Sequence, residues 1–333
     1  MSKNDPILIT GAGGHVGSVS KTMIEMLLKD GYRIRGFVRA DDERAEALRR
    51  IGAEVFVGDL LNPEDIANAM KGCRRVYFSM SLNPYYADAT ILMAAVAKAQ
   101  GNIEVLVNIS EYEQSRMTYD LMTSPRVARL QEFGGLVADW SPQQRAHWAS
   151  EQALKWSGLP IVNVQATMFA ENPIISWFIL KPMLESGELR LPFGDQRLAP
   201  IAAYDVAEFC AKVLSDPQPY LRKDYVLTGP RLVGGRDLAE IYSALLGRNI
   251  TYVPKDPETW SKMFIDTALA DKPHVAEHLR TLVLLVAGGF YNVVTDKLEQ
   301  MLSRTPKEPS WAFAQQPLLK QALQRNETSR TSS

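Results

Sequence analysis

The chain contains only two cysteines, Cys73 and Cys210. A framework of disulfide bonds is therefore not expected, and a reducing compartment fits the composition best. The net charge is also small. The 37 lysines and arginines nearly balance the 38 aspartates and glutamates, so the formal net charge is −1 at pH 7. That balance provides no field to attract nucleic acid or an anionic membrane. We therefore expect a partner other than nucleic acid.

Long apolar runs are missing as well. The longest, residues 282–290, is interrupted by Gly288 and Gly289, and it falls well short of the roughly twenty residues that a membrane-spanning helix needs. We expect this run to form a buried helix. Residues 1–6 lack the basic and apolar stretches of a secretion signal. The sequence thus predicts a cytoplasmic protein that does not enter a membrane.

Metal-binding clusters are not evident either. The four histidines are His15, His147, His274 and His278. None of them stands in a cluster with cysteines or carboxylates at metal-ligand spacing. We therefore predict no metal site.

What the sequence does contain is a glycine-rich turn near its start. The apolar run 7–9 leads through Thr10 into Gly-Ala-Gly-Gly-His-Val-Gly at 11–17, and residues 18–29 have the apolar spacing of a helix packed on a sheet. A turn without side chains lets backbone N–H groups approach a diphosphate, and the helix N-terminus adds partial positive charge. The spacing is G-x-x-G-x-x-G, with Gly13 as an extra glycine. It predicts a dinucleotide site, although tight turns also use glycine for purely structural reasons.

Strand-like and helix-like segments alternate through the first half. This alternation predicts an α/β fold, a doubly wound parallel sheet with helices on both faces. The expected strands are 7–9, 33–38, 54–57, 76–78, 105–109 and 160–164. The expected helices are 18–29, 43–50, 63–72, 87–99 and 143–156, and residues 111–142 are expected to be irregular.

The end of the second strand bears on which cofactor is used. An acidic residue there would bind the ribose hydroxyls of NAD, whereas an arginine can pair with the additional phosphate of NADP. The strand ends at Val38-Arg39, and no acid follows before Asp41. We therefore predict NADP, with NAD as the less favoured cofactor. The alternative is that Arg39 is a solvated loop residue or is held by the acids that follow.

Two further strand ends supply candidate cofactor contacts. Asp59 and Leu60 follow the third strand, where they could contact the adenine; alternatively, Asp59 or Asn62 caps the next helix. Ser79 and Met80 end the fourth strand at the carboxyl edge of the sheet, where ligands bind in such folds. The alternative for this pair is a simple loop.

These residues together resemble the NmrA-like family, a branch of the atypical short-chain dehydrogenase/reductases. The resemblance rests on T-G-A-G-G-H-V-G at 10–17, V-R at 38–39, G-A-E-V-F-V-G-D-L at 52–60, H-W-A-S-E at 147–151, S-G-L-P at 157–160, F-A-E-N at 169–172 and the segment 294–306. It implies a Rossmann sheet with a small C-terminal substrate domain. It also implies NAD(P) binding through Gly11, Gly14, His15, Val16, Gly17, Arg39, Asp59 and Leu60.

The resemblance implies two domains, and the polar composition of the last residues predicts a tail after them. Residues 1–165 are expected to form the NAD(P)-binding domain, with returning segments from the second half. Residues 166–325 are expected to form a mainly helical substrate domain or lid, and the polar residues 326–333 a disordered tail.

The chain departs from its relatives at two places. Ordinary short-chain dehydrogenases carry Tyr-x-x-x-Lys after the fifth strand, where the phenol donates a proton, and this chain has no such pair. The family usually has a lysine at the position of His147. The strand that usually reads L-R-P is Val164-Gln165-Ala166 here, so the family arginine is replaced by Gln165.

His147 and Ser110 are the candidate catalytic residues. His147 and Glu151 share one face of the expected helix. A histidine there could hold the cofactor ribose or protonate a substrate. The alternative is that the His147 ring is simply packed in the protein. Glu151 is interpreted as a solvated or capping carboxylate.

Ser110 stands where short-chain dehydrogenases keep a substrate-binding serine, and Tyr112 is a weaker candidate. Both can equally belong to a loop that borders the site.

The second half is rich in aromatic and apolar residues, most of which must form a core. If part of this surface faces the cofactor, the substrate is small, apolar and aromatic. We therefore predict an NAD(P)H-dependent oxidoreductase that reduces a quinone, enone, imine or similar substrate in secondary metabolism or detoxification. The alternative is a regulator that senses NAD(P), catalyses nothing and binds a transcription factor.

Overall fold

Residues 5–13 and 19–331 are described by the structure, a computed structural model, with side chains as far as Gln324. Gly14, His15, Val16 and Gly17, which the sequence assigns to the cofactor, lie outside the described residues. The chain divides into two compact units. Unit 1 comprises residues 1–117, 142–166 and 204–227, and unit 2 comprises residues 118–141, 167–203 and 228–333.

Unit 1 is built on a seven-stranded sheet in the order β3-β2-β1-β4-β5-β6-β9. All neighbouring strands are parallel, which confirms the predicted α/β Rossmann-like fold. The strands are β1 (Ile7–Ile9), β2 (Ile34–Val38), β3 (Glu54–Val57), β4 (Arg75–Phe78), β5 (Val105–Glu111), β6 (Ile161–Ala166) and β9 (Lys223–Leu227). Strands β1 and β4 are entirely buried, as expected of central strands covered on both faces.

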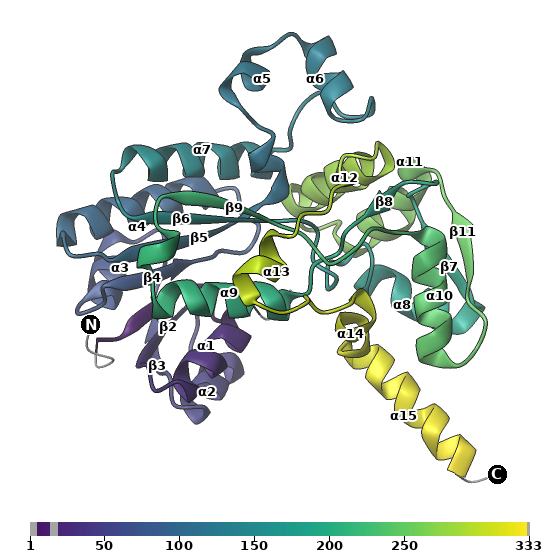
Figure 1. Cartoon of the computed structure of the whole chain (residues 1–333), viewed down its shortest axis with the longest axis horizontal. Coiled ribbons are helices and arrows are strands. Elements are labelled where there is room, and N and C mark those ends of the chain that lie inside the picture. The colour runs from purple at the N-terminus through teal and green to yellow at the C-terminus, as the bar shows by residue number, and fades with distance from the viewer. Residues whose placement is uncertain (1–4, 14–18, 332–333) are drawn as a thin grey trace. The chain divides into compact units, whose positions relative to one another are not determined.

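Helices cover both faces of this sheet, with α4 and α7 on one side and α1 and α9 on the other (Figure 1). The helices of unit 1 are α1 (Val19–Lys29), α2 (Glu43–Arg50), α3 (Pro63–Met70), α4 (Tyr86–Gln100), α7 (Pro142–Trp156) and α9 (Ala203–Ser215), with short turns η1 (Tyr112–Ser115) and η2 (Gln218–Tyr220). An apolar cluster that includes Leu8, Val76, Met93 and Leu106 forms the core between the sheet and α3, α4 and α7.

Side-chain caps set where two of these helices begin. Asp42 accepts the N–H groups of Arg44 and Ala45 at the start of α2. Asn62 accepts the N–H of Glu64 at the start of α3, and Pro63 occupies the first turn. Of the two caps considered for α3, the structure therefore uses Asn62.

Unit 2 contains two small sheets and most of the remaining helices. β7 (Glu188–Leu191) pairs in parallel with β11 (Thr251–Pro254), and β8 (Arg197–Leu198) pairs antiparallel with β10 (Val233–Gly234). The helices are α5 (Tyr119–Thr123), α6 (Arg126–Glu132), α8 (Trp177–Ser186), α10 (Gly235–Leu246), α11 (Pro257–Ser261), η3 (Lys262–Asp266), α12 (Pro273–Ala287), α13 (Lys297–Leu302), α14 (Pro309–Ala314) and α15 (Pro317–Thr331).

Three segments of the chain differ from expectation or refine it. The stretch 111–142, expected to be irregular, contains η1, α5 and α6. Helix α15 continues to Thr331, so residues 326–331, predicted to be disordered, extend a helix whose earlier turns pack on α8 and α10. Residues 282–287 of the apolar run form the end of α12, and Gly288 is the C-cap of this helix. Within the described residues, no helix is both long and apolar enough to span a membrane.

Candidate cofactor and active site

Gly11 begins the glycine-rich turn at the carboxyl end of β1. Its φ of +63° is one that side-chain-bearing residues rarely adopt, and a Cβ there would lie 2.9 Å from the carbonyl oxygen of Ser79. The neighbouring Thr10 hydroxyl donates to that carbonyl and accepts the N–H of Ser79, both at 2.8 Å. The start of the glycine turn and the end of β4 are thus held together, and the assignment of Gly11 and Ser79 to a cofactor stays a prediction.

Arg44 of α2 contacts the same turn. Its guanidinium donates to the carbonyl oxygen of Gly13 at 3.2 Å and to the carboxylate of Asp42 through Nε at 2.9 Å. The hydrogen bond from Arg44 lowers the pKa of Asp42 to about 2. The sequence analysis missed Arg44, which stands in an acidic run that is typical of a solvated helix start.

Arg39, the predicted phosphate contact, lies exposed after β2. The alternative interpretation offered Asp41 and Asp42 as partners of Arg39. Instead, Asp41 pairs with Arg49 and Asp42 pairs with Arg44. Among the described residues Arg39 forms no ion pair. The assignment of Arg39 to a 2′-phosphate stays a prediction.

The residues after β3 and β4 are arranged mainly by local contacts. Asp59 accepts the N–H of Leu61 at 2.9 Å, and its own N–H donates to Asp65 at 2.8 Å. Leu60 and Met80 are partly buried against the apolar cluster of unit 1. These contacts fix the loop, and an adenine contact from Asp59 or Leu60 remains a prediction.

His147 lies on the buried face of α7. Its ring packs against Tyr86 of α4 with ring centroids 4.1 Å apart, and its Nε2 lies 3.7 Å from Oε1 of Glu111. The Tyr86 hydroxyl donates to the carbonyl oxygen of Ile109 at 3.3 Å. Burial, together with the nearby Glu111 and Glu151, raises the pKa of Tyr86 well above that of a free phenol. The packed alternative for His147 thus gains support, and its catalytic role stays a prediction.

Ser110 lies near the carboxyl end of β5, in register with Gln165 of β6. Gln165 donates to both carboxylate oxygens of Glu151 on α7, at 3.1 Å and 2.9 Å. The Ser110 hydroxyl is buried and has no partner at ordinary hydrogen-bond geometry among the described residues. It is nevertheless close enough to Glu151 to lower the pKa of that carboxyl. Such a buried hydroxyl is suited to a polar atom of a ligand.

The interpretation of Glu151 as a solvated or capping carboxylate is wrong. Only 1% of the residue is exposed, and its carboxylate faces Gln165 rather than capping a helix. Burial raises the pKa of Glu151, while Ser110, Gln165 and Lys155 lower it. The net direction is upward, so the desolvation of the carboxylate outweighs the groups that stabilise its charge.

The aromatic residues of unit 2 form mostly core, as expected. Trp260 is fully buried between Phe178 and Phe264, and its indole N–H donates to the carbonyl oxygen of Arg190 at 2.9 Å. Trp177 stacks on Phe178 but is 58% exposed. That part of this aromatic surface faces a substrate stays a prediction.

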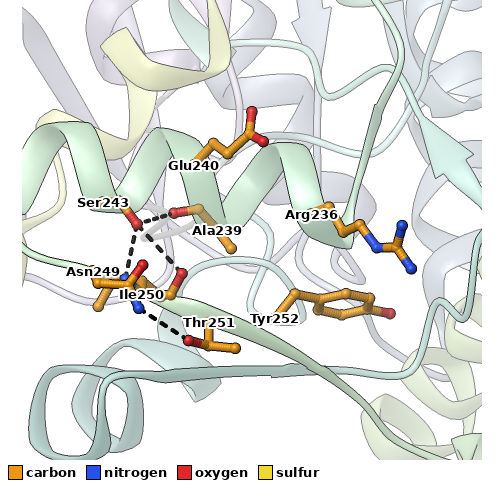
Figure 2. A pocket seen from close by; sticks show the side chains of 8 residues that line it. All are labelled: Arg236, Ala239, Glu240, Ser243, Asn249, Ile250, Thr251 and Tyr252. Carbon is orange, nitrogen blue, oxygen red and sulfur yellow. Dashed lines mark hydrogen bonds between the residues drawn. The ribbon is translucent and has the colours of Figure 1, made fainter.

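Unit 2 also has a shallow hollow between α10 and β11 (Figure 2). Its volume is about 440 Å³, and it is lined by Arg236, Ala239, Glu240, Ser243, Asn249, Ile250, Thr251 and Tyr252. Ser243 is already engaged there with the backbone of Ala239 and Ile250. None of the predicted site residues lines this hollow.

The structure also bears on metals. In the portion of the chain that it describes, no three histidine, cysteine, aspartate or glutamate side chains are grouped so as to hold a metal ion.

Comparison with known proteins places these observations in a family. Residues 11–217 match a family model described as NAD(P)H-binding. An NAD(P)H azoreductase from Xenophilus azovorans is 24% identical over 315 residues, which is 93% of this chain and 96% of the relative.

Solved structures share the fold over nearly the whole chain. An NADPH-dependent quinone oxidoreductase from Escherichia coli, solved with NADPH, has a TM-score of 0.74 at 21% identity and covers 92% of this chain and 98% of its own. NmrA, a negative transcriptional regulator, has a TM-score of 0.72 at 18% identity and covers 97% and 98%. The chain belongs to the NAD(P)H-binding family, and its fold is that of the NmrA-like proteins.

Proposed function

We propose that this protein is an NADPH-dependent reductase of small, apolar, unsaturated molecules such as quinones, azo dyes, enones or cyclic imines. The observation that carries the proposal is the turn at Gly11, where the backbone tolerates no side chain and is tied to the end of β4. Related proteins whose names state azoreductase and quinone oxidoreductase activity support the same reaction class. We place the activity in the cytoplasm.

The residues at the carboxyl edge of the sheet fit a dinucleotide. Gly11 and Gly13, together with Gly14 to Gly17, would surround the diphosphate with backbone N–H groups. Arg39 and Arg44 flank the end of β2, where two guanidinium groups suit a 2′-phosphate. Asp59 and Leu60 would border the adenine, and Ser79 and Met80 would border the other half of the cofactor.

Bound NADPH supplies a hydride, so the chain itself has to position the substrate and provide a proton. Ser110 is suited to contact a polar substrate atom, because its hydroxyl is buried at the strand end without an ordinary partner among the described residues. His147, held between Tyr86 and Glu111, would orient the cofactor ribose or the substrate. A reducible quinone or imine needs no Tyr-Lys pair, because it accepts a proton from a weak acid.

The activity is tested by incubating the protein with NADPH and each substrate class while following the absorbance of the reduced cofactor. Substrate-dependent oxidation of NADPH supports the proposal. A protein that binds NADPH firmly but oxidises it with none of these substrates contradicts it.

A second function is addressed by the same experiment. His147 stands where the family usually has a lysine, and it is packed against Tyr86 rather than open, which also suits a protein that binds NADP without reaction. The alternative is a redox-sensing regulator that binds a transcription factor. Firm cofactor binding without turnover would favour it.

A further inference from the structure

A continuous row of polar side chains runs between α7 and the sheet, where apolar packing is the rule. Asn108 donates to Asn163 at 3.0 Å, Asn163 donates to Asp224 at 2.8 Å, and Asp224 pairs with Lys155 at 2.8 Å. Lys155 lies 3.7 Å from Glu151, which Gln165 also contacts. We call the set of Asn108, Ser110, Glu151, Lys155, Asn163, Gln165 and Asp224 the polar row.

The two ends of the polar row differ in exposure. Lys155 and Asp224 have side chains that are 40% and 38% exposed, whereas that of Glu151 is 2% exposed. Beyond Glu151 the row continues through Gln165, which donates to Glu151, to Ser110, which stands in register with Gln165 at the carboxyl edge of the sheet where ligands of this fold bind. The row therefore connects solvent with the edge that carries the candidate site.

Glu151 is the one carboxyl in the buried part of this row. The groups that face it are Lys155 of its own helix, Ser110 of β5, Gln165 of β6 and Asp224 of β9, with Tyr86 of α4 also within electrostatic reach. Lys155, Ser110 and Gln165 favour the carboxylate, whereas burial and Asp224 favour the acid. The balance raises the pKa of Glu151 above that of an ordinary glutamate, so this carboxyl keeps its proton to a higher pH.

We propose that Glu151 stores the proton for the reduction and delivers it through the Ser110 hydroxyl, with Lys155 and Asp224 as the end that refills it from solvent. This inference rests on the proposed reductase function and adds a proton source to it.

Atoms and electrons balance in this step. The substrate gains a hydride, with its electron pair, from NADPH, and it gains a proton from the hydroxyl of Ser110. Ser110 takes a proton from the carboxyl of Glu151, which becomes a carboxylate. Glu151 then regains a proton from solvent at the end of the row that carries Lys155 and Asp224. The sum is substrate, NADPH and one proton converted to the reduced substrate and NADP⁺.

The first test is the pH dependence of turnover at saturating NADPH. Wild-type turnover should fall as pH rises through the pKa of Glu151. Glu151→Gln, which keeps the shape of the side chain, should lose this pH dependence and about 10²-fold in turnover, the lower end of general acid catalysis. Its affinity for NADPH should be unchanged.

Two further variants separate proton delivery from packing. Lys155→Met removes a charge that lowers the pKa of Glu151, so the fall in turnover should move to higher pH without disappearing. Glu25→Gln removes an exposed carboxyl on α1 and should leave the profile unchanged. A Glu151→Gln variant that folds, keeps the wild-type profile and turns over within about twofold of wild type overturns the proposal.

A second readout is independent of turnover. Infrared spectra of the cofactor-free protein, taken as wild type minus Glu151→Gln, should show a protonated carboxyl band that persists above the pH at which ordinary glutamates titrate. The band should shift promptly in heavy water, because the row connects Glu151 with solvent. Absence of the carboxyl band overturns the proposal that Glu151 stores a proton, even if the wild type is an active reductase. Its presence in a protein without turnover would instead refute the reductase function alone.

Discussion

The hydroxyl of Thr10 and the backbone of Ser79 are joined by two hydrogen bonds, one in each direction, at 2.8 Å. Sixty-nine positions separate them in the chain, yet they fix the ends of two neighbouring central strands. The glycine turn therefore starts from a defined point, because Gly11 follows Thr10 directly.

We predict that Thr10→Val weakens both folding and cofactor binding. Valine has nearly the same shape but leaves the N–H and the carbonyl of Ser79 without their partner, at a cost of about 1 to 3 kcal/mol for each unsatisfied group. Thr10→Ser, which keeps the hydroxyl, is the control and should bind NADPH nearly as wild type does. Urea denaturation and calorimetric titration measure the two effects. Equal behaviour of the valine and serine variants would contradict the prediction.

Gly11 and Gly31 allow the effect of conformation to be separated from that of contact. Both have positive φ, but a Cβ on Gly11 would meet the carbonyl of Ser79, whereas a Cβ on Gly31 meets nothing within 4 Å. Each alanine variant should lose about 1 to 2 kcal/mol of stability to backbone strain, and Gly11→Ala should lose more, because its Cβ also meets the carbonyl of Ser79. Only Gly11→Ala should also weaken the binding of NADPH and NADH, as measured by calorimetry. If Gly11→Ala binds both as tightly as Gly31→Ala does, the diphosphate lies elsewhere.

The cofactor preference depends on Arg39 in our proposal. Arg39→Ala should weaken NADPH binding by about 1.5 to 3 kcal/mol, the value of a hydrogen bond to a charged group, and leave NADH nearly unchanged. Arg49→Ala is the matched control, because that arginine is occupied with Asp41 and Glu46. Calorimetric titration measures the affinities of the wild type and both variants for NADPH and NADH. Equal wild-type affinities for NADPH and NADH would refute a preference for NADP.

His147 is tested by two substitutions with different packing. His147→Ala removes the ring, whereas His147→Phe keeps an aromatic ring against Tyr86 and removes only the imidazole. If the imidazole acts on the substrate, both should lower turnover at saturating NADPH with little change in cofactor affinity. Measurements across about pH 5 to 8 cover the titration of imidazole. Normal turnover by His147→Phe would identify His147 as a packing residue.

Stability should fall with rising pH because of Glu151. Burial raises the pKa of this carboxyl in the folded protein, so between the unfolded and the folded pKa the folded state binds more protons. The free energy of unfolding therefore decreases through that window, by about 1.4 kcal/mol for each pH unit between the two pKa values. Glu151→Gln should lose this dependence in urea denaturation from about pH 4 to pH 8. A variant that follows the wild-type curve in parallel would show that Glu151 titrates normally.

The order of strands and helices was predictable because it depends on local patterns. The helix 43–50 and the strand 54–57 have the predicted bounds, since capping residues, glycine stops and apolar spacing are adjacent in the chain. The helices in 119–132 escaped prediction because none of their residues is buried. They therefore lack the apolar stripe that marks a helix.

The candidate site was harder to predict because it depends on contacts between distant segments. Glu151 looked like a surface carboxylate, and Gln165 looked like the loss of a family arginine. The register of β5 and β6 brings Ser110 beside Gln165, and Gln165 donates to Glu151. These contacts show that Ser110, Gln165 and Glu151 belong to one cluster. Arg44 was missed for a similar reason, since its contact with Gly13 joins positions 31 residues apart.

The last strand of the sheet, β9, has a consequence for how the chain is made. Asp224 on β9 is the partner of both Asn163 and Lys155, and Arg75 on β4 donates to the backbone of Ser215 at 2.8 Å. Unit 1 thus stays incomplete until about residue 227 has left the ribosome, by which time residues 118–141 and 167–203 of unit 2 have already been synthesised. No single proteolytic cut can release a complete unit free of segments of the other unit, and a fragment ending at residue 165 would expose the edge of β6 to pairing with other chains.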